Sequence, residues 1–345
     1  MSPLRRPRYR IVLVLLASVL PYTVNAQTAA SFKDVPANST LFAPVEYLKE
    51  KGVLKGYDDG TFKPNNKVNR AEALKIILTP LLKPEDLPAS PPAVYSDVKP
   101  TDWFAPYVEL GRSSFKVIDG PPKATTFQGE KPVLKVQFLK MFFLANDIDP
   151  SASYSELKLP LASDVQQPAE WYYPALRYAI ATSMTMVQQD GTLGPAKELT
   201  RGDVALILYR YAMYQDGRRT QALLSEAEAE ISNVLELLGK KQTQQAEFAS
   251  ARALIASRGA LSSKPEDAVV KGAVKTAEGF QLLVQSYRAG TEGRLQDVLQ
   301  YTSDAWHLAE KAREYSPNLG TLSQQMQTIA KNMADEARAL LEKPK

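Results

Sequence analysis

The sequence has 345 residues, a formal net charge of +4, no cysteine and a single histidine, His307. Without cysteine, disulfides, cysteine-ligated zinc and thiol catalysis are excluded, and one histidine excludes any chemistry that needs a histidine pair. The small net charge gives no support for nucleic-acid binding, and a hydrophobic content of 44% is typical of chains that fold around packed cores.

The first 26 residues have the composition of a secretory signal peptide. Arginines at positions 5, 6, 8 and 10 precede an apolar run from Ile11 to Leu20, and Val24-Asn25-Ala26 supplies a small-residue cleavage site. The alternative is an uncleaved membrane anchor, but the apolar run is well short of the roughly 20 residues that a spanning helix needs. We expect residues 1–26 to be removed and the mature protein to be secreted, with no membrane span.

An internal repeat organises residues 31 to 215. The first copy starts with an aromatic-X-Asp-Val sequence at 32–35, continues through a glycine-rich turn, GVLKGYDDGTF, and reaches Asn69-Arg70-Ala71-Glu72 at the start of a second apolar run. Two degenerate copies of this repeat start around Asp97 and Asp164. We name 31–82, 94–148 and 161–215 the first, second and third segments; each predicts a helix, a turn and a second helix. One such unit cannot bury its own apolar face, so we expect the three to pack together.

Capping signals mark the second helix of two segments. Asn69 is followed three residues later by Glu72, and Thr200 is followed by Asp203, the spacing of a capping box. The second segment has Leu134-Lys135-Val136-Gln137 at the corresponding place.

The composition changes after residue 217, and residues 218–345 are rich in Ala, Leu, Glu, Gln and Lys. Apolar residues at helical spacing and short connections predict an antiparallel bundle of four or five helices. We expect Gly259 to end one helix and Ser263 with Glu266 to start the next. The glutamates of the first bundle helix are expected to form a solvated face; they are Glu228, Glu230 and Glu236.

The motifs of the first segment resemble the S-layer homology (SLH) domain of bacterial surface proteins. The pattern FxDV, GxxxGYxDGTFxP and then R-A-E is specific there, whereas the second and third segments are degenerate. The resemblance covers roughly residues 31–215 and says nothing about 218–345. It implies a mainly α fold, with three repeats in a pseudo-threefold arrangement. It also implies binding of a cell-wall polysaccharide, often a pyruvylated secondary polymer, in grooves between repeats.

The resemblance assigns polysaccharide-binding positions to three groups of residues. The cationic positions are Arg70, Lys135 and Arg201; the aromatic positions are Trp103 and Trp171, with Thr40 in the first segment; the glycine-turn positions are Gly56, Asp58, Asp59 and Gly60. The planar fork of arginine suits a carboxylate because it can donate two hydrogen bonds at once. In the alternative interpretation, the arginines pair with acidic residues at helix starts and the tryptophans are buried in the core.

Metal binding and catalysis have little support in the sequence. Asp58-Asp59-Gly60 lacks the spaced oxygen ligands and distant glutamate of a calcium loop, so we interpret it as a turn. His307 has no catalytic partner pattern and is interpreted as structural. We expect no metal, no cofactor and no enzyme activity.

Three hypotheses for function remain. The first is a secreted, non-catalytic envelope protein anchored to cell-wall polysaccharide (a secondary polymer or peptidoglycan), whose bundle is a spacer or contacts other envelope proteins. The second is an envelope scaffold that has lost sugar binding and acts through protein contacts. The third, a wall-modifying enzyme in the bundle, has no residue pattern behind it.

Overall fold

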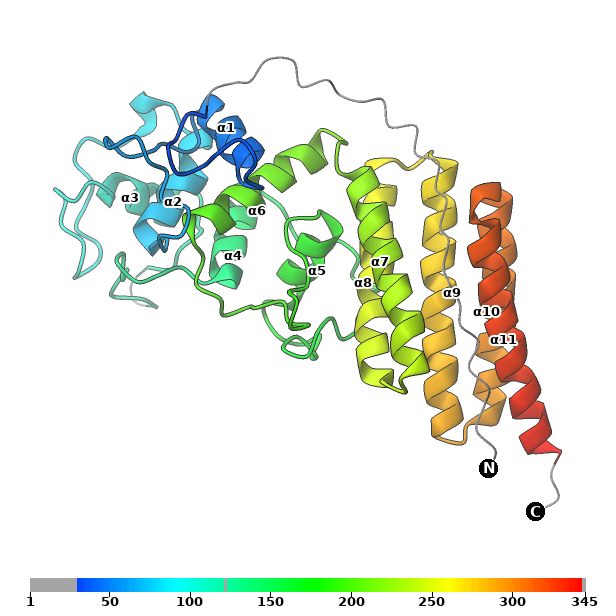
Figure 1. The fold of residues 1–345 in the computed structure, drawn as a ribbon. Coiled ribbons are helices and arrows are strands. Elements are labelled where there is room, and N and C mark those ends of the chain that lie inside the picture. Colours follow the sequence, from blue (N-terminus) through cyan, green and yellow to red (C-terminus); the bar gives the residue numbers. More distant parts are fainter. Residues whose placement is uncertain (1–29, 121–122, 343–345) are drawn as a thin grey trace.

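The computed structural model describes residues 30–120 and 123–342, so the predicted signal peptide lies outside it. These residues are mainly helical, which confirms the predicted fold class (Figure 1). Within the same ranges, pairing of extended backbone is limited to isolated bridges. No described helix is both long enough and apolar enough to cross a membrane.

Each of the three segments contains two α-helices joined through a turn. Their bounds are α1 Phe42–Glu50 and α2 Arg70–Leu78, α3 Ala105–Ser113 and α4 Lys135–Ala145, and α5 Tyr173–Ala181 and α6 Arg201–Gln215. Short 3₁₀ helices, η1 Thr79–Leu81 and η2 Pro84–Asp86, follow α2. The capping boxes predicted at Asn69 and Thr200 are both formed, and they start α2 and α6.

The aspartate that opens each segment ties the start of that segment to the end of its turn. Asp34 accepts hydrogen bonds from the backbone N–H groups of residues 62 and 63, both at 2.7 Å. Asp97 accepts from residues 127 and 128 at 2.8 and 2.7 Å, and Asp164 from residues 193 and 194 at 2.9 and 2.8 Å. Because a carboxylate that accepts two backbone bonds fixes both, this residue closes the turn in the same way three times.

A closed ring of backbone hydrogen bonds joins the three segments. Val68 N–H donates to the carbonyl of Leu199 at 2.9 Å, Leu199 N–H donates to Val133 at 3.0 Å, and Val133 N–H donates to Val68 at 2.9 Å. All three side chains are fully buried. The ring needs one donor and one acceptor from each segment, so it gives these residues a threefold arrangement.

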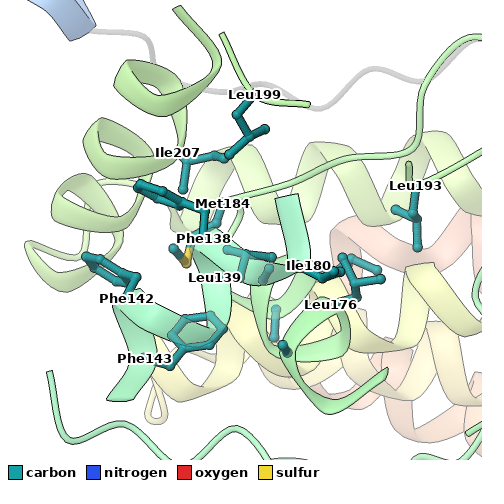
Figure 2. Close-up of a cluster of buried hydrophobic side chains, with 14 of the residues drawn as sticks. Phe138, Leu139, Phe142, Phe143, Leu176, Ile180, Met184, Leu193, Leu199 and Ile207 are labelled. Carbon is teal, nitrogen blue, oxygen red and sulfur yellow. The ribbon is translucent and has the colours of Figure 1, made fainter. Parts of the chain in front are cut away.

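Helix α4 carries the largest apolar face of the three segments. Its phenylalanines pack with side chains of α5, of α6 and of the turn of the third segment (Figure 2); the cluster includes Phe138, Leu139, Phe142, Phe143, Leu176, Ile180, Met184, Leu193, Leu199 and Ile207. Burial of these side chains is the main stabilising contribution in this part of the chain.

Residues 220–341 form five long helices that pack side by side in sequence order (Figure 1). They are α7 Thr220–Gly239, α8 Thr243–Ser263, α9 Ala268–Thr291, α10 Leu295–Tyr315 and α11 Gly320–Leu341, with the 3₁₀ helix η3 Pro317–Leu319 before the last. Short connections reverse the chain direction between neighbours, because a short loop can join helices only in this way.

Two helix boundaries predicted for the bundle are wrong. Gly259 lies inside α8, where a Cβ atom would be 1.8 Å from the carbonyl oxygen of Ala181. The glycine therefore permits close approach of α8 to the end of α5 and does not end a helix. Helix α9 is capped by Asp267, whose carboxylate accepts the N–H groups of Val269 and Val270, in place of the predicted Ser263–Glu266 box.

The prediction of a solvated face is also wrong for Glu230. Its side chain is buried and pairs with Arg252 on α8 at 2.6 and 2.8 Å. Arg252 also donates to the carbonyl of Leu161, in the third segment, at 2.7 Å. The buried pair thus connects the bundle to the third segment, and one cluster of buried apolar side chains includes residues of both.

Candidate functional site

Three seams separate the segments, and each is built from the same parts. The second helix of one segment starts against the turn of the next, through backbone hydrogen bonds from Arg70 to Lys131 at 2.9 Å, from Lys135 to Lys197 at 2.8 Å, and from Arg201 to Asn66 at 2.9 Å. We name them seam 1–2, seam 2–3 and seam 3–1. The three predicted cationic residues therefore occupy equivalent places.

Arg70 reaches across seam 1–2. Its Nε donates to the carbonyl of Phe127 at 3.1 Å, and its guanidinium lies 5.3 Å from the centre of the Phe127 ring. Burial lowers the pKa of Arg70, while nearby Tyr95 and Asp97 act in the opposite direction. Among the described residues, Nε is the only nitrogen of this guanidinium that has a hydrogen-bond partner.

Arg201 reaches across seam 3–1 to the glycine-rich turn of the first segment. Its Nε donates to the carbonyl of Phe62 at 2.8 Å and its Nη2 donates to Lys55 at 2.7 Å. The guanidinium lies 5.0 Å from the ring centre of Tyr57 and 4.6 Å from that of Phe62. The turn that carries Gly56, Asp58, Asp59 and Gly60 thus faces Arg201, and Arg70 of the same segment faces the next turn. Both arginines donate to backbone carbonyls, not to acidic side chains.

The Asp58-Asp59-Gly60 sequence forms a tight turn. Asp59 accepts the N–H and hydroxyl of Thr61 at 3.0 and 2.5 Å. The bond from this hydroxyl, then the contact with Lys63 and then the backbone bond lower the pKa of Asp59 to about 2. Gly60 has a φ of +76°, and a Cβ at Gly56 would lie 2.1 Å from the Phe32 ring. Among residues 30–120 and 123–342, no group of three potential metal ligands is close enough to hold an ion.

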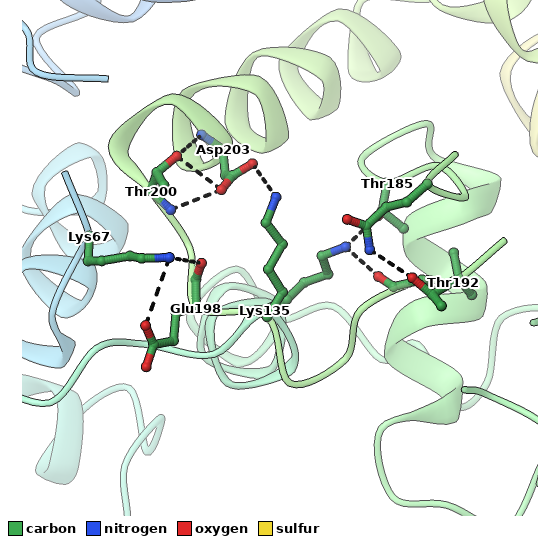
Figure 3. Close-up of polar contacts among 10 residues, drawn as sticks. Lys67, Lys135, Thr185, Thr192, Glu198, Thr200 and Asp203 are labelled. Atoms are coloured by element: carbon green, nitrogen blue, oxygen red, sulfur yellow. Dashed lines mark hydrogen bonds and ion pairs between the residues drawn. The ribbon is translucent and has the colours of Figure 1, made fainter. Parts of the chain in front are cut away.

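Lys135 occupies the cationic position of seam 2–3, but it is buried, with 6% of its surface exposed. Its ammonium donates to the carbonyl of Leu193 at 2.5 Å and to the hydroxyl of Thr185 at 3.4 Å (Figure 3). Burial lowers the pKa of Lys135 to about 8. With its donors directed at protein oxygens, Lys135 is poorly placed to bind a ligand directly.

Both predicted tryptophans lie on the surface, so the interpretation that they are core residues is wrong. Trp103 is 51% exposed and Trp171 is 58% exposed. Lys75 on α2 lies over Trp103, with Nζ 5.1 Å from the ring centre, and Lys140 on α4 lies over Trp171 at 5.5 Å. Sequence reasoning missed both lysines, although each follows the cationic position of its segment by one and a half helical turns. In seam 3–1 the corresponding residues are Thr40 and Leu206.

The structure thus distributes the predicted residues over three places. Arg70 and Trp103 belong to seam 1–2, Lys135 and Trp171 to seam 2–3, and Arg201 with the Gly56–Gly60 turn to seam 3–1. Seam 1–2 combines a cation, Arg70, with an exposed indole, a combination that suits a sugar with an acidic substituent, whereas Lys135 of seam 2–3 is buried.

Comparison with known proteins shows that part of the chain is similar in sequence to bacterial surface-layer proteins. Part of the chain is similar to "S-layer protein sap" of Bacillus anthracis, with 35% identity over 83 residues, which are 24% of this chain and 10% of the relative. It is also similar to "Surface layer protein" of Brevibacillus choshinensis, 28% identical over 146 residues (41% and 13%), and to "Surface-layer 125 kDa protein" of Lysinibacillus sphaericus, 26% identical over 202 residues (58% and 16%). The matched regions are thus less than a fifth of the length of these relatives.

The family model of the S-layer homology domain matches residues 31–74. These residues contain α1, the glycine-rich turn and the first half of α2, including Arg70. The chain therefore contains an S-layer homology domain at residues 31–74.

Proposed function

We propose that this protein is a secreted, non-catalytic envelope protein that three SLH-like repeats anchor to cell-wall polysaccharide. The receptor is a secondary cell-wall polymer or peptidoglycan. Residues 218–345 serve as a spacer or contact other envelope proteins. The S-layer homology domain and the surface-layer relatives support a cell-surface location and wall anchoring. The recurrence of the same aspartate and ring hydrogen bonds in all three segments supports treating 94–148 and 161–215 as further repeats.

The observation that carries the anchor proposal is the position of Arg70 and Arg201. Each lies at a seam, against an aromatic ring, and is held there by a hydrogen bond from Nε to a turn carbonyl. Such a bond orients the guanidinium before a ligand arrives, which reduces the entropy lost on binding. A carboxylate on a wall sugar would then meet a cation that is already oriented at the seam between two segments.

A second candidate function is an envelope scaffold without sugar binding. It is favoured by Lys135, which is buried and donates only to protein oxygens, and by the bonds of the two arginines to backbone carbonyls. If these contacts are the whole role of the three cations, the segments bind one another and no sugar.

Co-sedimentation of the secreted chain with purified cell walls separates the two functions. We would compare native walls with walls stripped of secondary polymer, and the wild type with Arg70→Ala, Arg201→Ala and the double variant. Hydrogen bonds to a charged group contribute about 1.5–3 kcal/mol each, so the double variant should bind native walls at least about tenfold more weakly. Equal binding to stripped walls would identify peptidoglycan as the receptor.

Arg338→Ala is the matched control, because Arg338 is an exposed arginine on α11, outside the segments. It should bind walls as the wild type does. Since Arg201 also holds the turn of the first segment, the melting temperature of each variant must be measured, and Arg201→Lys should retain the fold with weakened binding. Failure of the wild type to bind native walls would refute the anchor and leave the scaffold.

A further inference from the structure

A groove of about 400 Å³ runs along one side of Trp171. It is formed by the second half of α4, the residues that follow α4, and the start of α5; the side chains that matter here are Lys140, Leu144, Asp147, Asp149, Trp171 and Pro174. Lys135, at the other end of α4, does not line it. The groove is therefore separate from the cationic position that sequence analysis assigned to seam 2–3.

The groove combines apolar surface with hydrogen-bonding groups. Trp171 is 58% exposed and Leu144 is 44% exposed, which is unusual for such large apolar side chains beside each other in one hollow. Asp147 and Asp149 are both exposed, and the carboxylate of Asp149 is held by the N–H of Ser151 at 2.8 Å. An aromatic face can stack on the C–H face of a sugar ring, while carboxylates and an ammonium bind its hydroxyl groups.

The charges of the groove argue against an acidic ligand. The groove has one cation, Lys140, and two carboxylates, so an anionic ligand would meet net repulsion. Seam 1–2 differs at the corresponding positions. Leu82 and Pro84 follow Arg70 at the same sequence distances at which Asp147 and Asp149 follow Lys135. Seam 1–2 therefore retains Arg70 and Lys75 without acidic residues at those two places.

The internal comparison also argues that the lysine and tryptophan act together. Both are present in seams 1–2 and 2–3, and both are replaced in seam 3–1, by Leu206 and Thr40. A tryptophan kept only for packing would be buried, whereas Trp103 and Trp171 stay about half exposed under a lysine. If the lysine and the tryptophan contact the same ligand, both must lie at the surface of the same seam, as they do here.

We propose that the groove beside Trp171 binds an uncharged, hydroxyl-rich saccharide unit. Its ring stacks on the indole, and its hydroxyl groups bond to Asp147, Asp149 and Lys140. The inference rests on the proposed wall anchoring and extends it: acidic units of the polymer bind at Arg70 and Arg201, and an uncharged unit binds in this groove.

The test is a titration of the full secreted chain with two tetrasaccharides of equal length, followed by calorimetry and tryptophan fluorescence. One probe is the uncharged N-acetylglucosamine tetramer and the other is the anionic galacturonic acid tetramer. The uncharged tetramer should bind the wild type and quench its fluorescence. Trp171→Ala should weaken this binding at least about tenfold, the usual loss when a central aromatic contact is removed. Trp306→Ala is the matched control and should leave this binding unchanged, because Trp306 is an exposed indole on α10 of the bundle, away from the groove.

The double variant Asp147→Asn plus Asp149→Asn tests the charge argument. Asparagine keeps hydrogen-bonding groups and tolerates the positive φ of residue 147, so the fold should persist. The variant should gain affinity for the galacturonic acid tetramer relative to the uncharged one. The inference is overturned if the uncharged tetramer does not bind, if Trp171→Ala binds it as the wild type does, or if the wild type prefers the acidic tetramer.

The outcomes also separate this inference from wall anchoring. If wall binding depends on the arginines but the uncharged tetramer does not bind, the groove site is refuted and the proposed wall anchoring stands. If the uncharged tetramer binds through Trp171 but the chain does not bind walls, the groove site is supported and wall anchoring is refuted.

Discussion

Replacing Gly259 with alanine tests how closely the bundle packs on the third segment. The added Cβ would lie 1.8 Å from the oxygen, 2.6 Å from the carbonyl carbon and 2.9 Å from the Cα of Ala181. All three are backbone atoms, so no side chain can turn away to make room. Real Cβ atoms keep about 3 Å or more from such atoms, so α8 and the end of α5 would have to move apart by about 1 Å.

The loss in the free energy of unfolding follows from that displacement of α8 from α5. Overpacking of a dense interior costs about 1–3 kcal/mol, and a backbone clash belongs at the upper end. Alanine regains about 1 kcal/mol through its helix propensity. We therefore expect Gly259→Ala to lower the free energy of unfolding by about 2 kcal/mol, measured by urea denaturation followed by circular dichroism.

Gly239→Ala is the matched control. Gly239 is the last residue of α7, and a Cβ there would meet no atom within 4 Å. This variant should be as stable as the wild type or slightly more stable, because only the propensity term changes. If Gly259→Ala matched the wild type within about 0.5 kcal/mol, the close contact between α8 and α5 would be refuted.

Three further predictions concern polar groups that stabilise the fold. Glu230→Ala leaves Arg252 buried without its partner and should cost about 3–5 kcal/mol of unfolding free energy, whereas Glu236→Ala, at an exposed i,i+4 pair, should cost under about 1 kcal/mol; similar losses would contradict the buried pair. Asp164→Ala removes the acceptor of two backbone bonds and should cost about 2–3 kcal/mol, and a neutral result would contradict its role in closing the turn. The pKa of Lys135 is lowered to about 8, so between that pH and about 10.4 the unfolded chain binds this proton and the folded chain does not. The free energy of unfolding of the wild type, relative to Lys135→Met, should therefore rise by up to about 3 kcal/mol from pH 8 to pH 10.5; a constant difference would refute the burial of a charged lysine.

Local signals in the sequence determined the helical elements and the S-layer homology match. The capping boxes at Asn69 and Thr200 involve residues three positions apart, so their spacing is visible in the sequence and the structure forms both. The mainly α fold follows from apolar residues at helical spacing. The motif at residues 31–74 is likewise contiguous, which is why the sequence alone is enough to identify it.

The sequence predicted which residues belong to the candidate site, but not which residues contact one another there. Arg70, Arg201, Trp103 and Trp171 were named from their motif positions. The turn that each arginine faces was not predicted, because Arg201 and Phe62 lie 139 positions apart. Nor were Lys140 and the groove acids, since their proximity to Trp171 depends on how α4 packs against α5.

The tertiary structure alone decided which faces are covered. Periodicity shows that a helix has an apolar side, but it does not identify what packs against the other sides. The sequence pattern predicts a solvated Glu230, but α8 brings Arg252 against it; the pattern predicts a helix end at Gly259, but α5 lies within contact distance there. Trp171, whose large indole favours burial, stays exposed, whereas Phe143 and Leu176 of the neighbouring helices α4 and α5 are buried in the core. Sequence patterns report local preference, while burial is a property of partners distant in the chain, and only the folded structure supplies those partners.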